Sequence, residues 1–180
     1  MAEYYAFLTS ARMGLLDEET FLGLVSERYG AYLTALGSGD SLVSAAATKN
    51  TAATSYDLIY NGGVMASLLF DIETREAANG EKSLDDIVRA IHAEYANAKT
   101  PLTLKALRNL IRQETGVDFH HVIRRNIRRT EALDLAKALA AFGLVAEITM
   151  NEDGARVAVS RTPSPSSAQE ALYRAWLSGG

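Results

Sequence analysis

A tyrosine followed closely by two glycines is the feature of this sequence best suited to chemistry. Tyr60 precedes Asn61, Gly62 and Gly63 within the longest apolar stretch of the chain, residues 56–76. Glycine inside a helical pattern costs about 1 kcal/mol relative to alanine, so it often marks a close approach to the backbone. A phenol at such a place can donate a hydrogen bond to a developing oxyanion. Spacing alone favours a core tyrosine, so both interpretations of Tyr60 stay open at this point.

The histidines do not have the spacing of a metal site. His120 and His121 are adjacent, and adjacent side chains on a helix point about 100° apart. Metal ligands on one helix are instead spaced by three or four residues. His92 lies in the middle of an expected helix, next to its apolar stripe. We therefore expect structural or surface roles for all three and no metal ligands in this chain.

Four arginines form the most basic segment of the chain. Arg124, Arg125, Arg128 and Arg129 make two pairs spaced by four residues, a pattern that can line one helical face and bind phosphate. The net charge of the chain is −4 and no aromatic residue interrupts the cluster. A solvated face or ion pairs with carboxylates is therefore the favoured interpretation, and nucleic-acid binding is a minor alternative. Neither nucleic acid nor a membrane is an expected partner.

The composition is that of an ordinary globular protein. The chain has 180 residues, of which 48% are hydrophobic and 22% charged, enough for one domain with a core. There is no cysteine, which excludes disulfides and thiolate metal sites. The first residues carry Glu3 and no basic lead, so we expect no signal peptide in this chain, and no apolar run is long enough to span a membrane. P-loop, dinucleotide and Ser-His-Asp patterns are absent from the sequence.

Apolar residues recur at helical spacing through most of the chain. Residues 56–76 are apolar on more than one face, which predicts a central helix surrounded by others. The small, polar residues 38–53 are expected to form a long irregular connection with at most one helical turn. Caps and breaks delimit the expected helices, which cover about residues 2–13, 17–36, 54–79, 83–99, 103–115, 118–123 and 132–142.

The pattern changes in the last quarter of the chain. Residues 144–150 and 155–160 alternate between apolar and polar, and the four residues between them are expected to form the turn of a β-hairpin. A last helix with Trp176 on its inner side follows. We therefore expect a mainly α fold. A helical bundle around a central apolar helix would take residues 1–143, and the hairpin and terminal helix, residues 144–180, would pack on it.

Four stretches, in this order and spacing, resemble the glycyl aminopeptidase family of gluzincin zinc metallopeptidases. They are AEYYAFLTSARMGLLDEETFL, SYDLIYNGGVMASLLFDIETRE, KSLDDIVRAIHAEY and IRRTEALDLAKALAAFGL, and the resemblance covers about residues 2–146. It implies a parent protein that hydrolyses peptides as an aminopeptidase, with zinc polarising the carbonyl and activating water.

In that family the zinc site is an H-E-x-x-H helix followed by a glutamate in a segment like W-x-x-E-G-F-A-x-Y-Y. Residues 1–5 resemble the end of that segment, so the resemblance implies that every zinc ligand lies upstream of Met1. This chain would then be the C-terminal helical subdomain of a catalytic domain, without a cofactor of its own and inactive alone. Its partners would be the missing N-terminal catalytic subdomain and, in the parent, a peptide substrate.

The resemblance also assigns site residues. The family carries a Y-x-K-G motif at the start of the central helix, and residues 60–63 match it with Gly62 in place of lysine. This implies that Tyr60 is the catalytic tyrosine that hydrogen-bonds to the tetrahedral intermediate. It also implies that Gly62 and Gly63 are substrate-binding positions, and that residues 38–53 form a wall of the cleft.

The alternative is a non-catalytic helical binding or adaptor module. Gly62 and Gly63 would then only allow close packing of helices, and residues 38–53 would bind a partner. An H-E-x-x-H motif about twenty residues upstream in the gene would favour the peptidase, and its absence would favour the adaptor. The compartment is not fixed by the sequence: we expect a soluble chain, and the parent could be exported.

Overall fold

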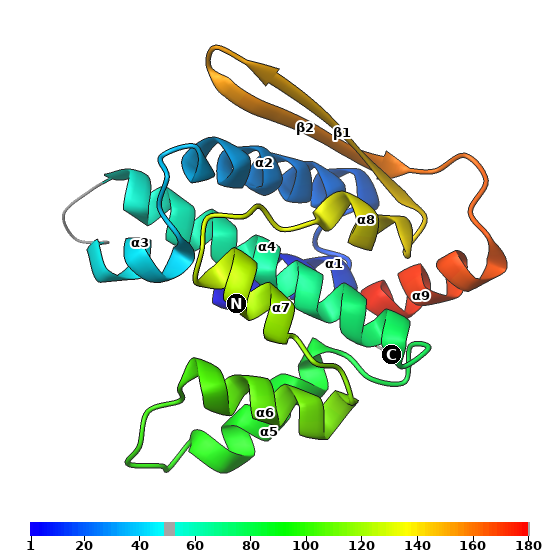
Figure 1. The fold of residues 1–180 in the computed structure, drawn as a ribbon. Coiled ribbons are helices and arrows are strands. Elements are labelled where there is room, and N and C mark those ends of the chain that lie inside the picture. The colour runs from blue at the N-terminus through cyan, green and yellow to red at the C-terminus, as the bar shows by residue number, and fades with distance from the viewer. Residues whose placement is uncertain (49–52, 180) are drawn as a thin grey trace.

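One long helix, α4 (Ala53–Ala77), runs through the middle of the protein, and the other elements pack around it (Figure 1). The computed structural model describes residues 1–48 and 53–179. The fold is mainly helical, with a small antiparallel hairpin and a C-terminal helix, which confirms the predicted fold class. Apolar side chains are buried on several sides of α4, among them Leu58, Val64, Met65, Leu68, Leu69, Phe70 and Ile72. The central position predicted for this helix is therefore confirmed.

The two helices before the connection begin and end where the sequence predicts. The first, α1 (Ala2–Arg12), stops just before Gly14, whose φ of +70° is left-handed. The second, α2 (Glu18–Leu36), begins at Asp17, whose carboxylate accepts a hydrogen bond from the Thr20 amide at 2.8 Å. Such a cap satisfies an amide that the helix itself leaves without a partner.

The connection between α2 and α4 is more regular than expected. It contains a helix of about two turns, α3 (Leu42–Thr48), which packs on α4. The helix begins where the Ser41 hydroxyl accepts a hydrogen bond from the Ser44 amide at 3.0 Å. The prediction of a mainly irregular segment over 38–53 is thus wrong for its middle part, and residues 49–52 lie outside the described residues.

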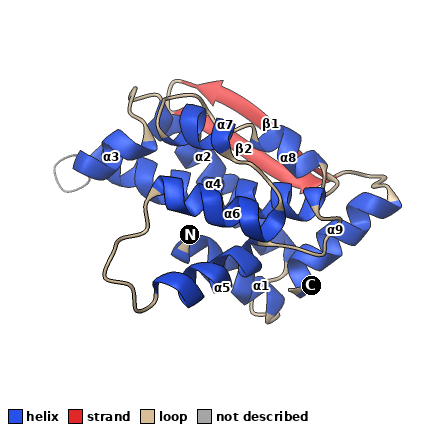
Figure 2. Ribbon diagram, turned by 60° about the horizontal axis from the view of Figure 1, so that its bottom comes forward, coloured by secondary structure: helices blue, strands red, loops and turns tan. Residues whose placement is uncertain are grey.

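Two amphipathic helices follow α4 on the side away from the hairpin (Figures 1 and 2). The capping box predicted at the start of α5 (Leu84–Tyr95) is confirmed, because the Ser83 amide donates to the Asp86 carboxylate at 2.9 Å. Thr103 caps α6 (Leu104–Thr115) as predicted. Both helix caps involve residues that are close in sequence, so they could be predicted without knowledge of the fold.

The segment after α6 is more broken than expected. Its elements are α7 (His120–Val122), the π-helical turn η1 (Ile123–Ile127) and α8 (Leu135–Ala140). The helix expected over 132–142 is shorter, and the Leu133 amide before it donates instead to the Tyr32 hydroxyl at 3.1 Å. The last helix, α9 (Ser167–Ser178), buries Trp176 completely, as predicted. Within the described part of the chain no helix is both long and apolar enough to cross a bilayer.

The predicted hairpin is confirmed, but its turn is shorter than expected. Strands β1 (Leu144–Asn151) and β2 (Gly154–Arg161) pair in antiparallel register. Asn151 pairs directly with Gly154, so the turn has two residues between paired positions rather than four. Gly154, which ends the turn, has a φ of +121°, a conformation that glycine adopts readily.

The hairpin lies across α2 and is attached to it by side chains (Figure 1). The Ser26 hydroxyl accepts from the Val159 amide at 2.9 Å, and the Thr34 hydroxyl accepts from the Ala155 amide at 2.9 Å. Gly30 lies between these two contacts, and a Cβ atom there would be 2.8 Å from the Ala155 carbonyl oxygen. The backbones of α2 and β2 can approach this closely only because residue 30 has no side chain.

Replacing Gly30 by alanine is therefore expected to lower the free energy of unfolding by about 1–3 kcal/mol, because a backbone oxygen cannot move aside as a flexible side chain can. Gly23→Ala on the same helix is the matched control. No described atom outside the helix lies within 4 Å of a Cβ at residue 23, so helix propensity should make this change neutral or stabilising by up to about 1 kcal/mol. Urea denaturation followed by circular dichroism measures both. Equal shifts for the two variants would contradict the close approach.

Candidate functional site

Tyr60 lies on the first half of α4 with 46% of its surface exposed. The interpretation of Tyr60 as a core tyrosine is therefore wrong. Its neighbours Leu58 and Val64 supply the buried side of the helix at this level. The Tyr56 ring, one turn earlier, lies 4.1 Å from the Tyr60 ring between centroids, at an interplanar angle of 32°. Contact between the two rings restricts the orientation of the Tyr60 ring at the surface.

Tyr60 stands on a ridge between two surface hollows. Asp57 and Asn61 line a polar hollow of about 620 Å³ between α2, α4 and β2. Ile59 and Gly63 line an apolar groove of about 220 Å³ between α4, α6 and η1. At about 100° per residue, these two pairs fall on opposite sides of residue 60. Tyr60 thus lies between helix positions that line the two hollows, and its own side chain lines neither of them.

The two glycines after Tyr60 have different surroundings. Gly62 is buried beneath α3, and a Cβ there would be 2.4 Å from Leu42 Cδ2 and 3.3 Å from Tyr32 Cδ2. A lysine at this position, as in the motif that the sequence resembles, would require Leu42 to move. Gly63 is half-buried and lines the apolar groove, where its Cβ would lie 3.9 Å from the Met1 nitrogen. Only Gly63 thus borders open space.

Charged groups of both signs lie beside this ridge. The Arg28 guanidinium forms an ion pair with Glu3 at 2.9 Å and donates to the side-chain oxygen Oδ1 of Asn61 at 3.4 Å. Burial lowers the pKa of the Met1 ammonium group, and the nearby Glu3 carboxylate opposes that change. The start of α1 is in this way held against α2 and α4 next to the candidate site.

The Tyr60 hydroxyl is the group of this site that can act on a substrate. A hydrogen bond with Tyr60 is the main cause that raises the pKa of Tyr56 above its ordinary value of 10.0. A phenol is both a donor and an acceptor, so Tyr60 can engage Tyr56 and still turn its proton to a ligand. The chemistry available is hydrogen-bond donation to an oxygen that gains negative charge, such as a carbonyl under attack.

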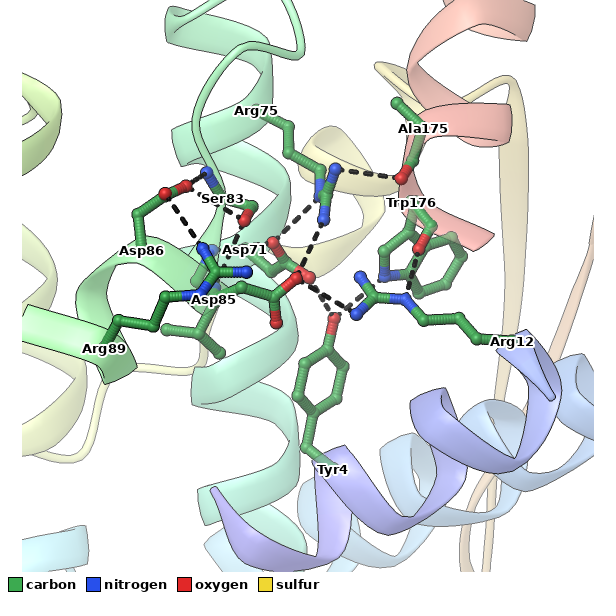
Figure 3. Close-up of polar contacts among 11 residues, drawn as sticks. Tyr4, Arg12, Asp71, Arg75, Ser83, Asp85, Asp86, Arg89, Ala175 and Trp176 are labelled. Atoms are coloured by element: carbon green, nitrogen blue, oxygen red, sulfur yellow. Dashed lines mark hydrogen bonds and ion pairs between the residues drawn. The ribbon is translucent and has the colours of Figure 1, made fainter. Parts of the chain in front are cut away.

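The most extensive polar cluster of the protein surrounds a different part of α4 (Figure 3). The Asp71 carboxylate accepts from the Tyr4 hydroxyl at 2.6 Å, from Arg75 Nε at 3.0 Å and from the Leu84 amide at 3.0 Å. Trp176 Nε1 donates to the Tyr4 hydroxyl at 2.8 Å. Asp71 and Arg75 are each only 1% exposed. Burial is the main cause that raises the pKa of Tyr4 well above its ordinary value.

A second layer of contacts ties the same cluster to α1 and α9 (Figure 3). Arg12 pairs with Asp85 at 3.0 Å and donates to the Trp176 carbonyl at 3.0 Å. Arg75 donates to the Ala175 carbonyl at 3.0 Å. Asp85 is thus part of an ion pair between helices α1 and α5. The cluster joins α1, α4, α5 and α9 and has no open face for a ligand, so we assign it to stability.

The three histidines lie at the surface, one of the two roles expected for them. His92, His120 and His121 are exposed, and His120 Nδ1 is 2.9 Å from Arg108 Nη1. Among residues 1–48 and 53–179 there is no group of three or more histidine, aspartate or glutamate side chains that could hold a metal ion. The described residues therefore do not fit a zinc site.

The four arginines after α7 separate into two sets. Arg125 forms an ion pair with Glu131 at 3.6 Å, in line with the favoured interpretation. Arg124 and Arg128, four residues apart, instead line a hollow next to α6. Arg124 and Arg125 lie within the π-helical turn η1, and Arg128 directly follows it, so this turn influences which of these side chains share a face.

Comparison of this chain with models of known protein families, with characterised proteins and with solved structures finds no match. Three residues of interest were missed by the sequence analysis. Tyr56 could have been found from its four-residue spacing to Tyr60, which places both rings on one helical face. Asp71 and Arg75 have the same spacing inside the most apolar helix, a pattern that indicates a buried ion pair.

Proposed function

We propose that this chain is the helical part of a zinc aminopeptidase-like protein, in which it forms one wall of the active-site cleft and supplies Tyr60 as oxyanion donor. The observation that carries the proposal is the exposure of Tyr60, 46%, on a helix that is otherwise mostly buried. A core tyrosine could not reach a substrate, whereas this exposed one lies between helix positions that line two hollows. The resemblance of residues 60–63 to the Y-x-K-G motif supports the same role.

The proposed role of Tyr60 is to donate its hydroxyl hydrogen to the carbonyl oxygen of a peptide bond as that oxygen gains charge. Such a donor accelerates a reaction because its hydrogen bond is stronger in the transition state than in the ground state. Tyr56 contributes by holding the ring in place, and Gly63 by keeping the adjoining groove open. Gly62 contributes to packing beneath α3 rather than to contact with the substrate.

Zinc belongs to the proposed parent and not to this chain. The described residues offer no ligand group, so we propose that a separate N-terminal catalytic subdomain holds the metal and faces Tyr60. We assign no step of the metal's chemistry to residues of this chain. The chain alone is therefore proposed to be inactive.

The test compares the full-length protein with the 180-residue chain. The full-length protein is expected to contain zinc and to hydrolyse aminoacyl p-nitroanilides, and removal of zinc by a chelator should abolish that activity. The isolated chain should bind zinc at well below one equivalent by metal analysis and show no hydrolysis. Stoichiometric zinc in the isolated chain, or an inactive zinc-loaded full-length protein, would overturn the proposal.

One observation favours the adaptor alternative. Gly62 is covered by Leu42 and Tyr32, so it allows close packing of helices, the role that a non-catalytic module would give it. The gene upstream of Met1 distinguishes the two functions. An intact H-E-x-x-H motif there would favour the peptidase, and a gene without it would favour the adaptor.

A further inference from the structure

A basic hollow lies beside the apolar groove, between α6 and the segment that contains α7 and η1. Its volume is about 350 Å³, within the lower range of small-ligand sites. We call it the basic hollow, and its lining residues are Leu104, Lys105, Arg108, His120, Ile123, Arg124 and Arg128. Four of these side chains are cationic, and they come from two separate segments of the chain.

The positive charge of the basic hollow is not neutralised within the described part of the protein. No described carboxylate lines it, and Lys105, Arg108, Arg124 and Arg128 form no ion pair with any described residue. This concentration of charge occurs in a chain whose net charge is −4. Four cationic residues around one hollow create a local positive potential that attracts an anion.

His120 orients one of these cations. Its Nδ1 atom lies 2.9 Å from Arg108 Nη1, and a guanidinium can only donate, so Nδ1 accepts and carries no proton. His120 thus takes one donor of Arg108, and the side-chain oxygen of Asn109 takes another, from Nη2 at 3.4 Å. The remaining guanidinium donors stay available for a planar anion, and carboxylates are bound by arginine in this way.

The floor of the basic hollow is apolar and continuous with the apolar groove. Leu104 and Ile123 line both. Gly63, which lines the groove at another point, is three residues from Tyr60 and so lies on a neighbouring face of α4. A ligand with an anionic end in the basic hollow would thus have its adjoining apolar part in the groove that Gly63 lines, three residues along α4 from the proposed catalytic tyrosine.

We infer that the basic hollow binds the C-terminal carboxylate of a short peptide whose last side chain is apolar. This inference rests on the proposed function and narrows its substrate class to short peptides with a free C-terminus. The carboxylate suits the arginine donors, and the apolar side chain suits the floor formed by Leu104 and Ile123. A fully hydrated inorganic anion would leave that floor without a contact.

Fluorescence anisotropy tests the inference on the 180-residue chain itself, at about 50 mM salt where screening is weak. The probe is an N-terminally labelled tetrapeptide that ends in leucine with a free carboxylate, compared with the same peptide as its C-terminal amide. We expect the amide to bind about tenfold more weakly or worse, the scale of one lost charge-assisted hydrogen bond. Equal affinity for the two peptides would overturn the inference.

A charge-matched pair of variants localises the binding. Arg124→Gln with Arg128→Gln should weaken binding of the free-carboxylate peptide at least about tenfold. Arg125→Gln with Arg129→Gln removes the same charge from the same segment outside the lining of the basic hollow, and should change affinity less than about twofold. Equal losses in both double variants would show a general effect of charge and overturn the assignment. Both variants must keep the circular dichroism spectrum of the unaltered chain.

Two further binding measurements identify which kind of anion the basic hollow binds. A tetrapeptide amide with an internal glutamate should bind as weakly as the plain amide, and inorganic phosphate should compete only at much higher concentration than the free-carboxylate peptide. Tight binding of either would overturn the C-terminal assignment. This outcome can be told apart from that of the proposed function. If the chain binds the peptide but the full-length protein hydrolyses none, only the proposed peptidase function is wrong. If the full-length protein hydrolyses peptides but the basic hollow binds none, only this inference is wrong.

Discussion

Tyr60→Phe in the full-length protein is expected to lower kcat for peptide hydrolysis by about 10²–10³-fold, with the zinc content unchanged. The change removes one hydroxyl from a side chain that is 46% exposed, so the cost to folding should be small. Loss of one donor to a developing oxyanion acts on the transition state, and kcat should therefore fall more than KM changes. Steady-state kinetics combined with metal analysis measure both quantities.

Tyr95→Phe is the control for this change. Tyr95 is partly exposed at the end of α5, outside the helix that carries the proposed donor, so its replacement should leave kcat within about twofold. A Tyr60→Phe enzyme with unaltered kcat would remove the phenol from the mechanism. A parallel loss of zinc and activity would instead indicate that Tyr60 supports the structure of the parent.

The central helix and most helix starts could be predicted because their causes are local. Residues 56–76 carry enough apolar side chains to cover several faces of a helix, and such a helix has no stable position except the centre. The starts at Asp17, Ser83 and Thr103 are confirmed. In each case a short polar side chain caps amides two or three residues ahead, so the interaction lies within a few letters of sequence.

The candidate site could be predicted only in part, because exposure depends on the whole fold. The sequence identified Tyr60 but favoured the core, since apolar residues surround it on both sides. Its exposure follows from where α2, α3 and α6 leave α4 uncovered, which no local pattern encodes. The basic hollow was missed for the same reason: Lys105 and Arg108 come from α6, whereas Arg124 and Arg128 come from the segment after α7.

The buried cluster around Asp71 required contacts between residues distant in sequence. Tyr4, which donates to Asp71, stands 67 residues before it in the sequence. Trp176, which donates to Tyr4, stands 172 residues after Tyr4. An aspartate in an apolar helix is unfavourable unless hydrogen bonds and a cation compensate its charge. The presence of Asp71 and Arg75 in residues 56–76 indicated that such partners exist, but not which residues they are.

Asp71→Ala is expected to lower the free energy of unfolding by about 3–5 kcal/mol, the usual cost of removing one partner from a buried ion pair. Arg75 would lose the carboxylate at 3.0 Å and remain charged at 1% exposure. The Tyr4 hydroxyl and the Leu84 amide would lose an acceptor as well. Because the free energy of unfolding of a typical domain is only about 5–15 kcal/mol, this single change should remove a large part of it.

Urea denaturation of the 180-residue chain separates this ion pair from a general effect of removing a carboxylate from α4. Asp57→Ala, on an exposed position of the same helix, should change the free energy of unfolding by about 0.5 kcal/mol or less. Asp71→Asn should cost less than Asp71→Ala, because its amide oxygen can still accept from Tyr4 or Leu84. Asp71→Leu combined with Arg75→Met should cost less than the sum of the two single changes, since no unpaired charge is left buried. Additive costs in that double variant would mean that the carboxylate and the guanidinium act independently, and the account of the cluster as one unit would be wrong.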